Sequence, residues 1–188
     1  MITGMNHAVL YVRDARRHAA FYRDVLDFEV IVDDDLGRYA FLRAPGSPNH
    51  HDLACFTIGD QAGPSAAGRS TVGLYHIAWS VPTLADLDAH RVRLEAAGAL
   101  HGSSDHAVNK SLYAVDPDGL EFEVMWLAPP EAWGDDEHQA IIRPLDIPGD
   151  IERFGADTDT TIHHPPAPVG AAIGSTSDAG SVAGGAAS

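Results

Sequence analysis

Hydrophobic and polar positions over the first 60 residues follow the order strand, helix, strand, strand, strand. Residues 5–12 alternate as a strand does, and residues 14–26 place apolar side chains at helical spacing behind Asp14, a residue type that caps helix N-termini. Further strands bounded by turn residues are predicted at 29–33, 38–43 and 52–58. The pattern therefore predicts a βαβββ module over residues 1–60.

The same pattern recurs after a linker. Residues 61–72 are mostly small or polar and contain Gly and Pro, which separates the first module from the segment that follows. A strand is predicted at 74–81, a helix capped by Thr83 at 83–98, and closing strands at 111–116 and 120–127. The two halves align at an offset of 69 residues, which places His76 at the position of His7. We therefore expect an internal duplication of α+β class, with a second module over 73–128.

The chain after residue 128 departs from this repeat. Residues 129–156 are punctuated by Pro and carry apolar anchors such as Trp133 and Leu145, so we expect an extension that packs on the domain. Residues 157–188 consist largely of Ala, Gly, Ser, Thr and Pro, with too few large apolar side chains to offset the entropy of ordering. This segment is predicted to be a disordered tail.

Composition excludes several classes of function. The formal net charge of −15, without a basic stripe, argues against binding to nucleic acid. No apolar run approaches the roughly 20 residues of a membrane span. A single cysteine, Cys55, cannot form an intramolecular disulfide, and the N-terminus lacks a basic region followed by an apolar one. We therefore expect a cytoplasmic protein.

Strand alternation points to a metal site. In residues 120–127 the bulky apolar side chains share one face, and Glu123 lies on the other. His76 stands on the less bulky face of its strand, and the duplication relates it to His7. Taken alone, each histidine is more typical of a half-buried strand residue, and the glutamate of a surface acid. Together they form a 2-His-1-carboxylate set, which suits Fe(II) because it leaves positions open for substrate and dioxygen.

Other histidines carry no predicted chemistry. His18 and His90 lie on the predicted helices, where a solvated or hydrogen-bonded side chain is the common case. His101 and His138 fall in segments that we expect to be loops.

Residues 4–127 resemble the vicinal-oxygen-chelate superfamily of glyoxalases, extradiol dioxygenases and bleomycin-binding proteins. The segment from His106 through Leu112-Tyr113 and Asp116-Pro-Asp-Gly119 to Glu123 is similar to the extradiol signature of His, apolar-Tyr, Asp-Pro-x-Gly and a ligand Glu. The resemblance implies two βαβββ modules forming a U-shaped mixed sheet around a metal held by His7, His76 and Glu123. It further implies Fe(II) as the metal, with Mn, Ni or Zn as alternatives, and a catechol-type aromatic and dioxygen as substrates.

The resemblance also assigns roles to three further residues. The run His50-His51-Asp52-Leu53-Ala54 is similar to the His-His-x-Leu-Ala strand of extradiol enzymes, in which the second histidine handles protons; this makes His51 the acid–base candidate. His106 and Tyr113 are expected to hydrogen-bond the reacting oxygens. The chain departs from the pattern at Ser104, at Leu120, and in the longer spacing from His51 to His76.

Two alternatives stay open at this point. A glyoxalase-like lyase or isomerase would need a fourth ligand at the position related to Glu123, which is Ala54, unless Asp52 slides into it by a shift of register. A drug-binding protein without catalysis is a second alternative; such relatives usually lose the ligand residues, and their presence in this chain argues against it. A homodimer is expected because sheet edges are exposed and relatives pair through these modules.

Overall fold

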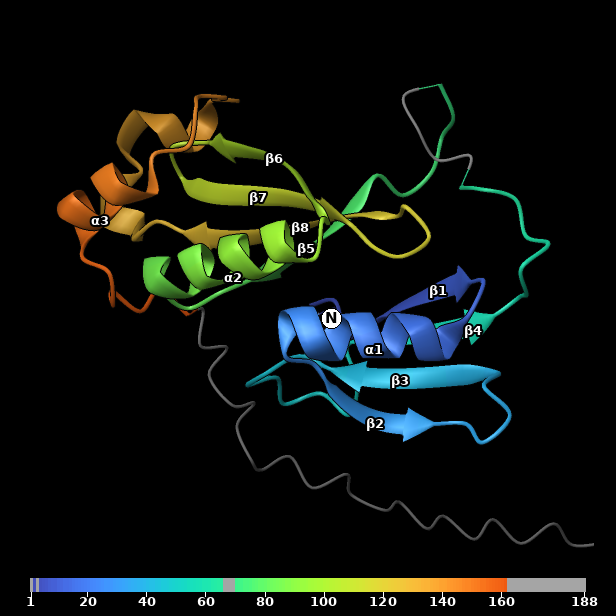
Figure 1. Cartoon of the computed structure of the whole chain (residues 1–188). Coiled ribbons are helices and arrows are strands. Elements are labelled where there is room, and N and C mark those ends of the chain that lie inside the picture. Colours follow the sequence, from blue (N-terminus) through green and yellow to red (C-terminus); the bar gives the residue numbers. More distant parts are fainter. Residues whose placement is uncertain (1, 3, 66–69, 162–188) are drawn as a thin grey trace, which may run out of the picture.

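A computed structural model describes residues 2, 4–65 and 70–161 of the chain (Figure 1). The first module consists of β1 (Ala8–Val12), α1 (Ala15–Leu26), β2 (Glu29–Asp33), β3 (Tyr39–Arg43) and β4 (Leu53–Thr57). The second consists of β5 (His76–Ser80), α2 (Leu84–Ala96), β6 (Leu100–Asp105), β7 (Asn109–Val115) and β8 (Glu121–Leu127). Two 3-10 turns, η1 (Pro130–Ala132) and η2 (Gly134–His138), and helix α3 (Ile147–Phe154) follow. The predicted α+β fold of two βαβββ modules is confirmed.

Each module folds around its own four-stranded sheet. The strand orders are β1-β4-β3-β2 and β5-β8-β7-β6, so β1 and β5 each lie at a sheet edge. In both modules the first and last strands pair in parallel and the others antiparallel. Val9 lies opposite Ala54 in the first sheet, and Ala78 lies opposite Glu123 in the second. These pairs are related by the 69-residue offset, which confirms the duplication.

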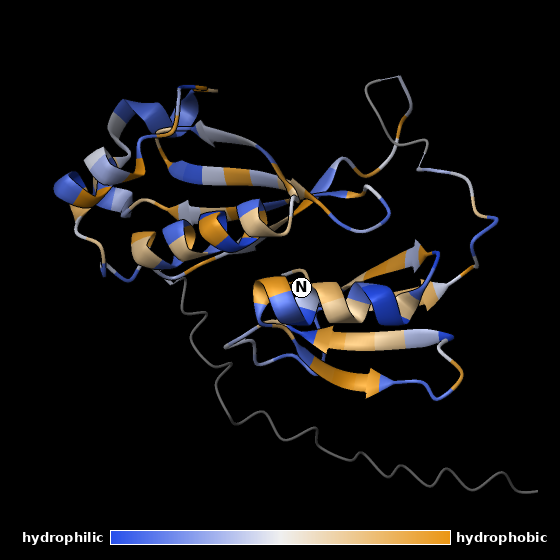
Figure 2. Ribbon diagram, in the orientation of Figure 1, coloured by the Kyte–Doolittle hydropathy of each residue, from blue (hydrophilic) through white to orange (hydrophobic). Residues whose placement is uncertain are grey.

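Helix α1 packs between its own sheet and the second module. Its buried face includes Tyr22, whose ring lies 5.9 Å from that of Phe122 on β8. After the helix, Phe28 meets Trp79 of β5 edge to face, with ring centroids 5.1 Å apart. Buried residues of both modules belong to one hydrophobic cluster, and Figure 2 shows apolar residues along the strands and on the helices. The two modules therefore share a core.

A buried polar cluster also joins the modules. His18 of α1 is fully buried, and its Nε2 lies 3.2 Å from Asp116 Oδ2 in the turn between β7 and β8. Asp118 in the same turn accepts hydrogen bonds from the backbone N and a guanidinium N of Arg13. The Asp-Pro-Asp-Gly turn predicted from the sequence thus contacts α1, and His18 has a buried ionic partner rather than a solvated side chain.

The extension after β8 packs along the second module. Its Arg143 exchanges two backbone hydrogen bonds with Asp105 at the end of β6. The buried Lys110 amine lies 2.5 Å from Asp105 Oδ1 and 3.2 Å from Asp150 Oδ1 on α3. These contacts pair a buried cation with two carboxylates.

The predicted tail of residues 157–188 lies outside the described residues from residue 162 onward. Its first residues are described, and Thr160 N donates to Pro82 O at 3.0 Å. In the described ranges, no helix has both the length and the apolar character needed to cross a membrane.

Replacing Asp14 with alanine is expected to destabilise the fold by about 1 kcal/mol, because its carboxylate caps α1 by accepting from Arg16 N and Arg17 N. Urea unfolding followed by circular dichroism measures the change. Asp24→Ala removes a carboxylate near the end of the same helix without removing a cap and serves as the matched control. Equal losses in the two variants would contradict the capping role.

Candidate functional site

Two of the predicted metal ligands stand side by side on the second sheet. His76 begins β5 and Glu123 lies on β8, the strand with which β5 pairs in parallel. His76 Nε2 lies 3.0 Å from Glu123 Oε2. Two donor atoms at right angles around one ion, each at about 2.1 Å from it, would be separated by about 3 Å. An imidazole and a buried carboxylate at this spacing fit a divalent metal.

Tyr113 and His106 lie next to this pair. Tyr113 faces Glu123 across the β7–β8 pairing, and its ring centroid is 5.9 Å from that of His76. Its hydroxyl lies 2.8 Å from His106 Nε2. The Nδ1 of His106 lies 2.6 Å from the carbonyl oxygen of Ile141, which can only accept, so Nδ1 carries the proton and Nε2 accepts from Tyr113. Burial, and then the charge of Glu123, raise the pKa of Tyr113.

His7 and His51 form a second group on the first module. His7 directly precedes β1, and its ring centroid lies 4.5 Å from that of His51. The His51 ring stacks on Phe41 at 5.0 Å and an interplanar angle of 18°. Burial, and then the neighbouring His7 and His50, lower the pKa of His51. At neutral pH His51 is therefore an uncharged imidazole that can accept a proton.

The structure thus gathers the predicted site residues into two groups rather than one. His76, Glu123, Tyr113 and His106 lie together, whereas His7 lies with His51. Within residues 2, 4–65 and 70–161, no three His, Cys, Asp or Glu side chains stand close enough together to hold a metal ion. Ligation by His7, and the role of His51 beside that ligand set, stay predictions.

The strand registers of the two sheets show which residues stand where a fourth protein ligand would be. Ala54 occupies the place in the first sheet that Glu123 occupies in the second, and Asp52 corresponds to Glu121. The Asp52 carboxylate instead accepts hydrogen bonds from Ala44 N, Ser47 Oγ and Asn49 Nδ2. Asp52 therefore holds its own loop, and the register does not slide to bring it to the ligand position.

Sequence reasoning missed two polar residues beside His76. Glu121 lies directly opposite His76 in the β5–β8 pairing. His101, expected in a loop, lies in β6, at a shift of register between Leu100 and Gly102 that marks a β-bulge. Strand alternation carried a signal for Glu121, because residues 121 and 123 share a face; no comparable signal marks His101.

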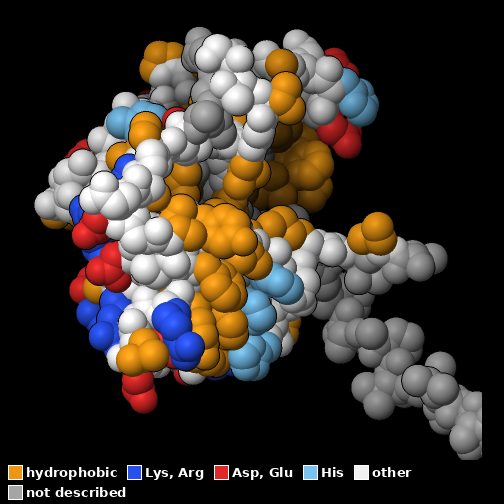
Figure 3. All heavy atoms as spheres, turned by 90° about the vertical axis from the view of Figure 1, so that its right-hand side faces the viewer, with side chains coloured by type: hydrophobic (Ala, Val, Ile, Leu, Met, Phe, Trp, Pro, Cys, Tyr) orange, Lys and Arg blue, Asp and Glu red, His pale blue; other side chains and the backbone are white. Residues whose placement is uncertain are grey.

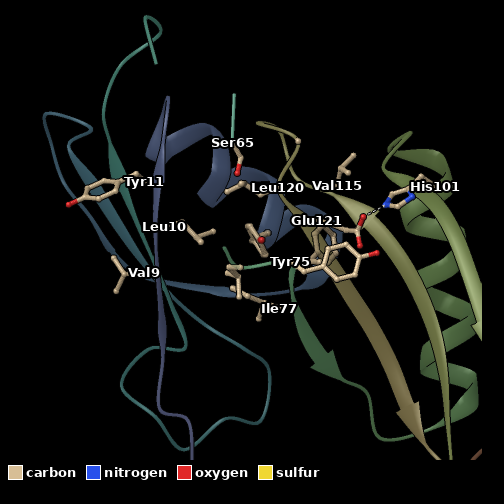
Figure 4. A pocket seen from close by; sticks show the side chains of 14 residues that line it. Val9, Leu10, Tyr11, Ser65, Tyr75, Ile77, His101, Val115, Leu120 and Glu121 are labelled. Atoms are coloured by element: carbon tan, nitrogen blue, oxygen red, sulfur yellow. Dashed lines mark ion pairs between the residues drawn. The ribbon is translucent and has the colours of Figure 1, made fainter. Parts of the chain in front are cut away.

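A cleft of about 690 Å³ opens beside Glu121 and His101 (Figure 4). Its walls include Leu10 of β1, Ile77 of β5 and Leu120. Figure 3 shows hydrophobic side chains gathered in a band on one face of the molecule, with histidine side chains beside it. Clefts with apolar walls and a few polar groups commonly bind small molecules, but His76, Glu123, Tyr113 and His106 do not line this one.

Residues 4–124 match the protein family described as the Glyoxalase/Bleomycin resistance protein/Dioxygenase superfamily. The chain belongs to this superfamily. It is 32% identical over 166 residues to the catechol-2,3-dioxygenase of Bacillus subtilis (strain 168), an alignment that covers 85% of this chain and 55% of that protein. It is also 32% identical over 140 residues to the biphenyl-2,3-diol 1,2-dioxygenase 3 of Rhodococcus globerulus, covering 70% of this chain and 68% of that protein. The chain thus spans about half the length of the Bacillus relative.

Solved structures support the same fold. A glyoxylase/bleomycin resistance protein/dioxygenase domain from Frankia sp. EAN1pec matches with a TM-score of 0.58 and 26% identity, covering 69% of this chain and 96% of that one. A fosfomycin resistance protein from Listeria monocytogenes, in complex with Mn(II) and sulfate, matches with a TM-score of 0.53 and 23% identity, covering 71% and 97%. At that identity, the second likeness concerns the fold alone.

Proposed function

We propose that this protein is an Fe(II)-dependent extradiol dioxygenase that cleaves the ring of a catechol-type aromatic. The observation that carries the proposal is the group of His76, Glu123, Tyr113 and His106, in which an imidazole and a carboxylate at metal-ligand spacing stand beside a phenol hydrogen-bonded to a histidine. Two curated dioxygenases at 32% identity, and Ala54 in place of a fourth ligand, favour this reaction over a glyoxalase-like one. His7 is the proposed third ligand.

When bound, Fe(II) supplies the redox chemistry that allows a catechol to react with dioxygen. The side chains of the protein position the substrate and move protons. Tyr113 keeps its proton at neutral pH and donates to His106 Nε2. A substrate hydroxyl can donate to the Tyr113 oxygen while the Tyr113 proton moves toward His106, so the pair can hold a substrate proton in a fixed place.

The extension contributes to this proton path. The carbonyl of Ile141 fixes the tautomer of His106, and the backbone pairing of Arg143 with Asp105 holds the extension in register one residue before His106. His51, whose lowered pKa keeps it neutral, is the proposed base on the first module. Its stacking on Phe41 fixes its ring plane.

The proposed substrate class follows from the apolar cleft and the vicinal donors that a ring-cleaving site must bind. A catechol presents two adjacent hydroxyls to a metal, and its apolar ring suits a cleft with walls such as Leu10 and Ile77, which lies beside Glu121 and is not lined by the proposed ligands. A homodimer and a cytoplasmic location, expected from the sequence, stay predictions.

The function is tested by loading the protein anaerobically with Fe(II), quantifying bound iron, and following dioxygen uptake and the yellow ring-opened product with a panel of catechols. We expect stoichiometric iron, and one dioxygen consumed per catechol cleaved. Protein loaded with Zn(II), which has no redox chemistry, is the matched control and should show no uptake. Bound iron without dioxygen uptake across the panel would contradict the dioxygenase and favour a lyase or isomerase.

A further inference from the structure

Glu121 lies next to His76, and this contact is not accounted for by the proposed metal ligands alone. Its Oε1 lies 3.7 Å from His76 Nδ1, which is longer than a hydrogen bond. Both atoms are buried, and neither has a hydrogen-bond partner among the described residues. A buried imidazole nitrogen and a buried carboxylate oxygen without hydrogen-bond partners are both costly. A hydrogen bond between His76 Nδ1 and Glu121 Oε1, formed if the two atoms moved closer together, would remove this cost.

Metal binding at His76 would determine which ring nitrogen carries the proton, and so whether His76 can donate a hydrogen bond to Glu121. The Nε2 of His76 faces Glu123 at 3.0 Å, so it is the nitrogen placed to bind a metal. An imidazole that binds through Nε2 is neutral and carries its proton on Nδ1, the nitrogen that faces Glu121. A carboxylate behind a metal-bound histidine fixes its tautomer and ring orientation.

The far side of Glu121 is also held. Its Oε2 lies 3.3 Å from Nε2 of His101, the ion pair drawn as a dashed line in Figure 4. His101 lies at the β-bulge of β6, and a bulge turns the side chain that it carries away from the regular alternation. The His101 side chain is 44% exposed, so the row of contacting side chains from His76 through Glu121 to His101 reaches the solvent.

The first module provides an independent comparison. Asp52 occupies the register position of Glu121, but its oxygens are bound by its own loop. The ring of His7 meets an oxygen acceptor nonetheless, because His7 Nδ1 lies 2.8 Å from Asn6 Oδ1. In both modules, therefore, a side-chain oxygen lies near Nδ1 of the histidine at the duplicated position, at 2.8 Å for His7 and at 3.7 Å for His76.

We propose that Glu121 is a positioning residue that accepts the Nδ1 proton of His76 and aims Nε2 at the metal beside Glu123, while His101 holds Glu121 in place. This inference rests on the proposed metal-dependent function. It assigns to Glu121 no direct contact with metal or substrate.

The first test measures Co(II) affinity by titration of the visible absorption of the bound ion. Glu121→Ala is expected to weaken Co(II) binding by about 10- to 100-fold. Glu121→Gln keeps an oxygen that accepts from Nδ1, so it should recover part of that loss. Glu131→Ala, which removes an exposed carboxylate of the extension that follows β8, is the matched control and should bind as the wild type does. Equal affinities for the wild type and Glu121→Ala would overturn the inference.

The second test reads the tautomer of His76 directly, by ¹H–¹⁵N correlation of histidine ring nitrogens in the Zn(II)-loaded protein. The wild type should show His76 protonated at Nδ1 with Nε2 bound to metal. Glu121→Ala should broaden or shift that pattern, whereas a variant that merely loosens the sheet would leave it in place. An unchanged His76 pattern in Glu121→Ala would overturn the inference while leaving the proposed function intact. Failure of the wild type to bind Co(II) or Zn(II) would overturn both.

Discussion

Replacing Glu123 with alanine is expected to abolish stoichiometric iron binding and, with it, dioxygen uptake. Glu123 supplies the only negative charge of the three proposed ligands, and its Oε2 lies 3.0 Å from His76 Nε2. Loss of a residue behind a ligand costs about 10- to 100-fold in metal affinity, so loss of the ligand itself should cost more than about 100-fold. Isothermal titration with Fe(II) under anaerobic conditions measures the affinity, and an oxygen electrode measures the turnover.

The fold should survive this change. Apart from its contact with His76, Glu123 accepts one long hydrogen bond from Asn109 Nδ2 at 3.4 Å, and a small side chain leaves no unpaired buried charge at that position. Glu131→Ala, in the extension that follows β8, again controls for loss of one negative charge. Thermal unfolding without metal should give similar midpoints for Glu123→Ala and the wild type. Iron bound by Glu123→Ala at wild-type affinity would remove Glu123 from the ligand set.

The local sequence pattern specifies which side chains share a strand face and which positions of the two modules are equivalent. Period-two alternation placed Glu123 opposite Phe122 and Val124, and the structure confirms this split, because those two apolar side chains belong to the core. The 69-residue offset was enough to predict that His7 and His76 occupy equivalent positions. Register within a sheet is dictated by the hydrophobic pattern, which explains why these inferences were accurate.

The segments that sequence reasoning missed have weak patterns. Strand β6 reads Leu-His-Gly-Ser-Ser-Asp, with little apolar alternation, and its pairing with β7 supplies the structure that its own residues do not predict. His101 was therefore expected in a loop. The buried His18 and Lys110 pair with carboxylates far away in the sequence, Asp116 and Asp150, and a local sequence pattern does not predict such partners.

The relation between the modules is a further limit of local pattern. His7 directly precedes β1, whereas His76 and Glu123 lie on β5 and β8, and no pattern within one module specifies how the two sheets are placed relative to each other. The contacts that join the modules come instead from packing of α1 against β8 and from the turn between β7 and β8. The convergence of His7 with His76 and Glu123 was inferred from strand alternation, the duplication and the family resemblance, and it stays a prediction.

Replacing Asp116 with alanine is expected to destabilise the protein by about 3–5 kcal/mol, because it leaves His18 buried without its partner. The same carboxylate also accepts from Asp118 N and Leu120 N, so the turn that contacts α1 loses its internal bonds. Asp116→Asn keeps an oxygen for those two backbone donors and removes only the charge, and it should cost less. Urea unfolding at fixed pH measures both variants, and equal losses would contradict a role for the charge.

The pH dependence gives a sharper test of the same contact. Burial alone would lower the pKa of His18, but the hydrogen bond that its imidazole donates to the Asp116 carboxylate, the carbonyl of Asp14 and the charges of Asp116 and Asp118 outweigh it and raise that pKa. A raised pKa in the folded state contributes stability that is fully present below the unfolded value of about 6.5 and is lost as the pH rises through the folded value. The wild type should therefore lose stability on going from about pH 6 to about pH 9. Asp116→Asn should lose less over that interval, because only Asp118, at 3.8 Å, and the Asp14 carbonyl then favour the charged imidazole. If the two proteins lose stability equally over this interval, the ion pair between His18 and Asp116 does not hold the modules together.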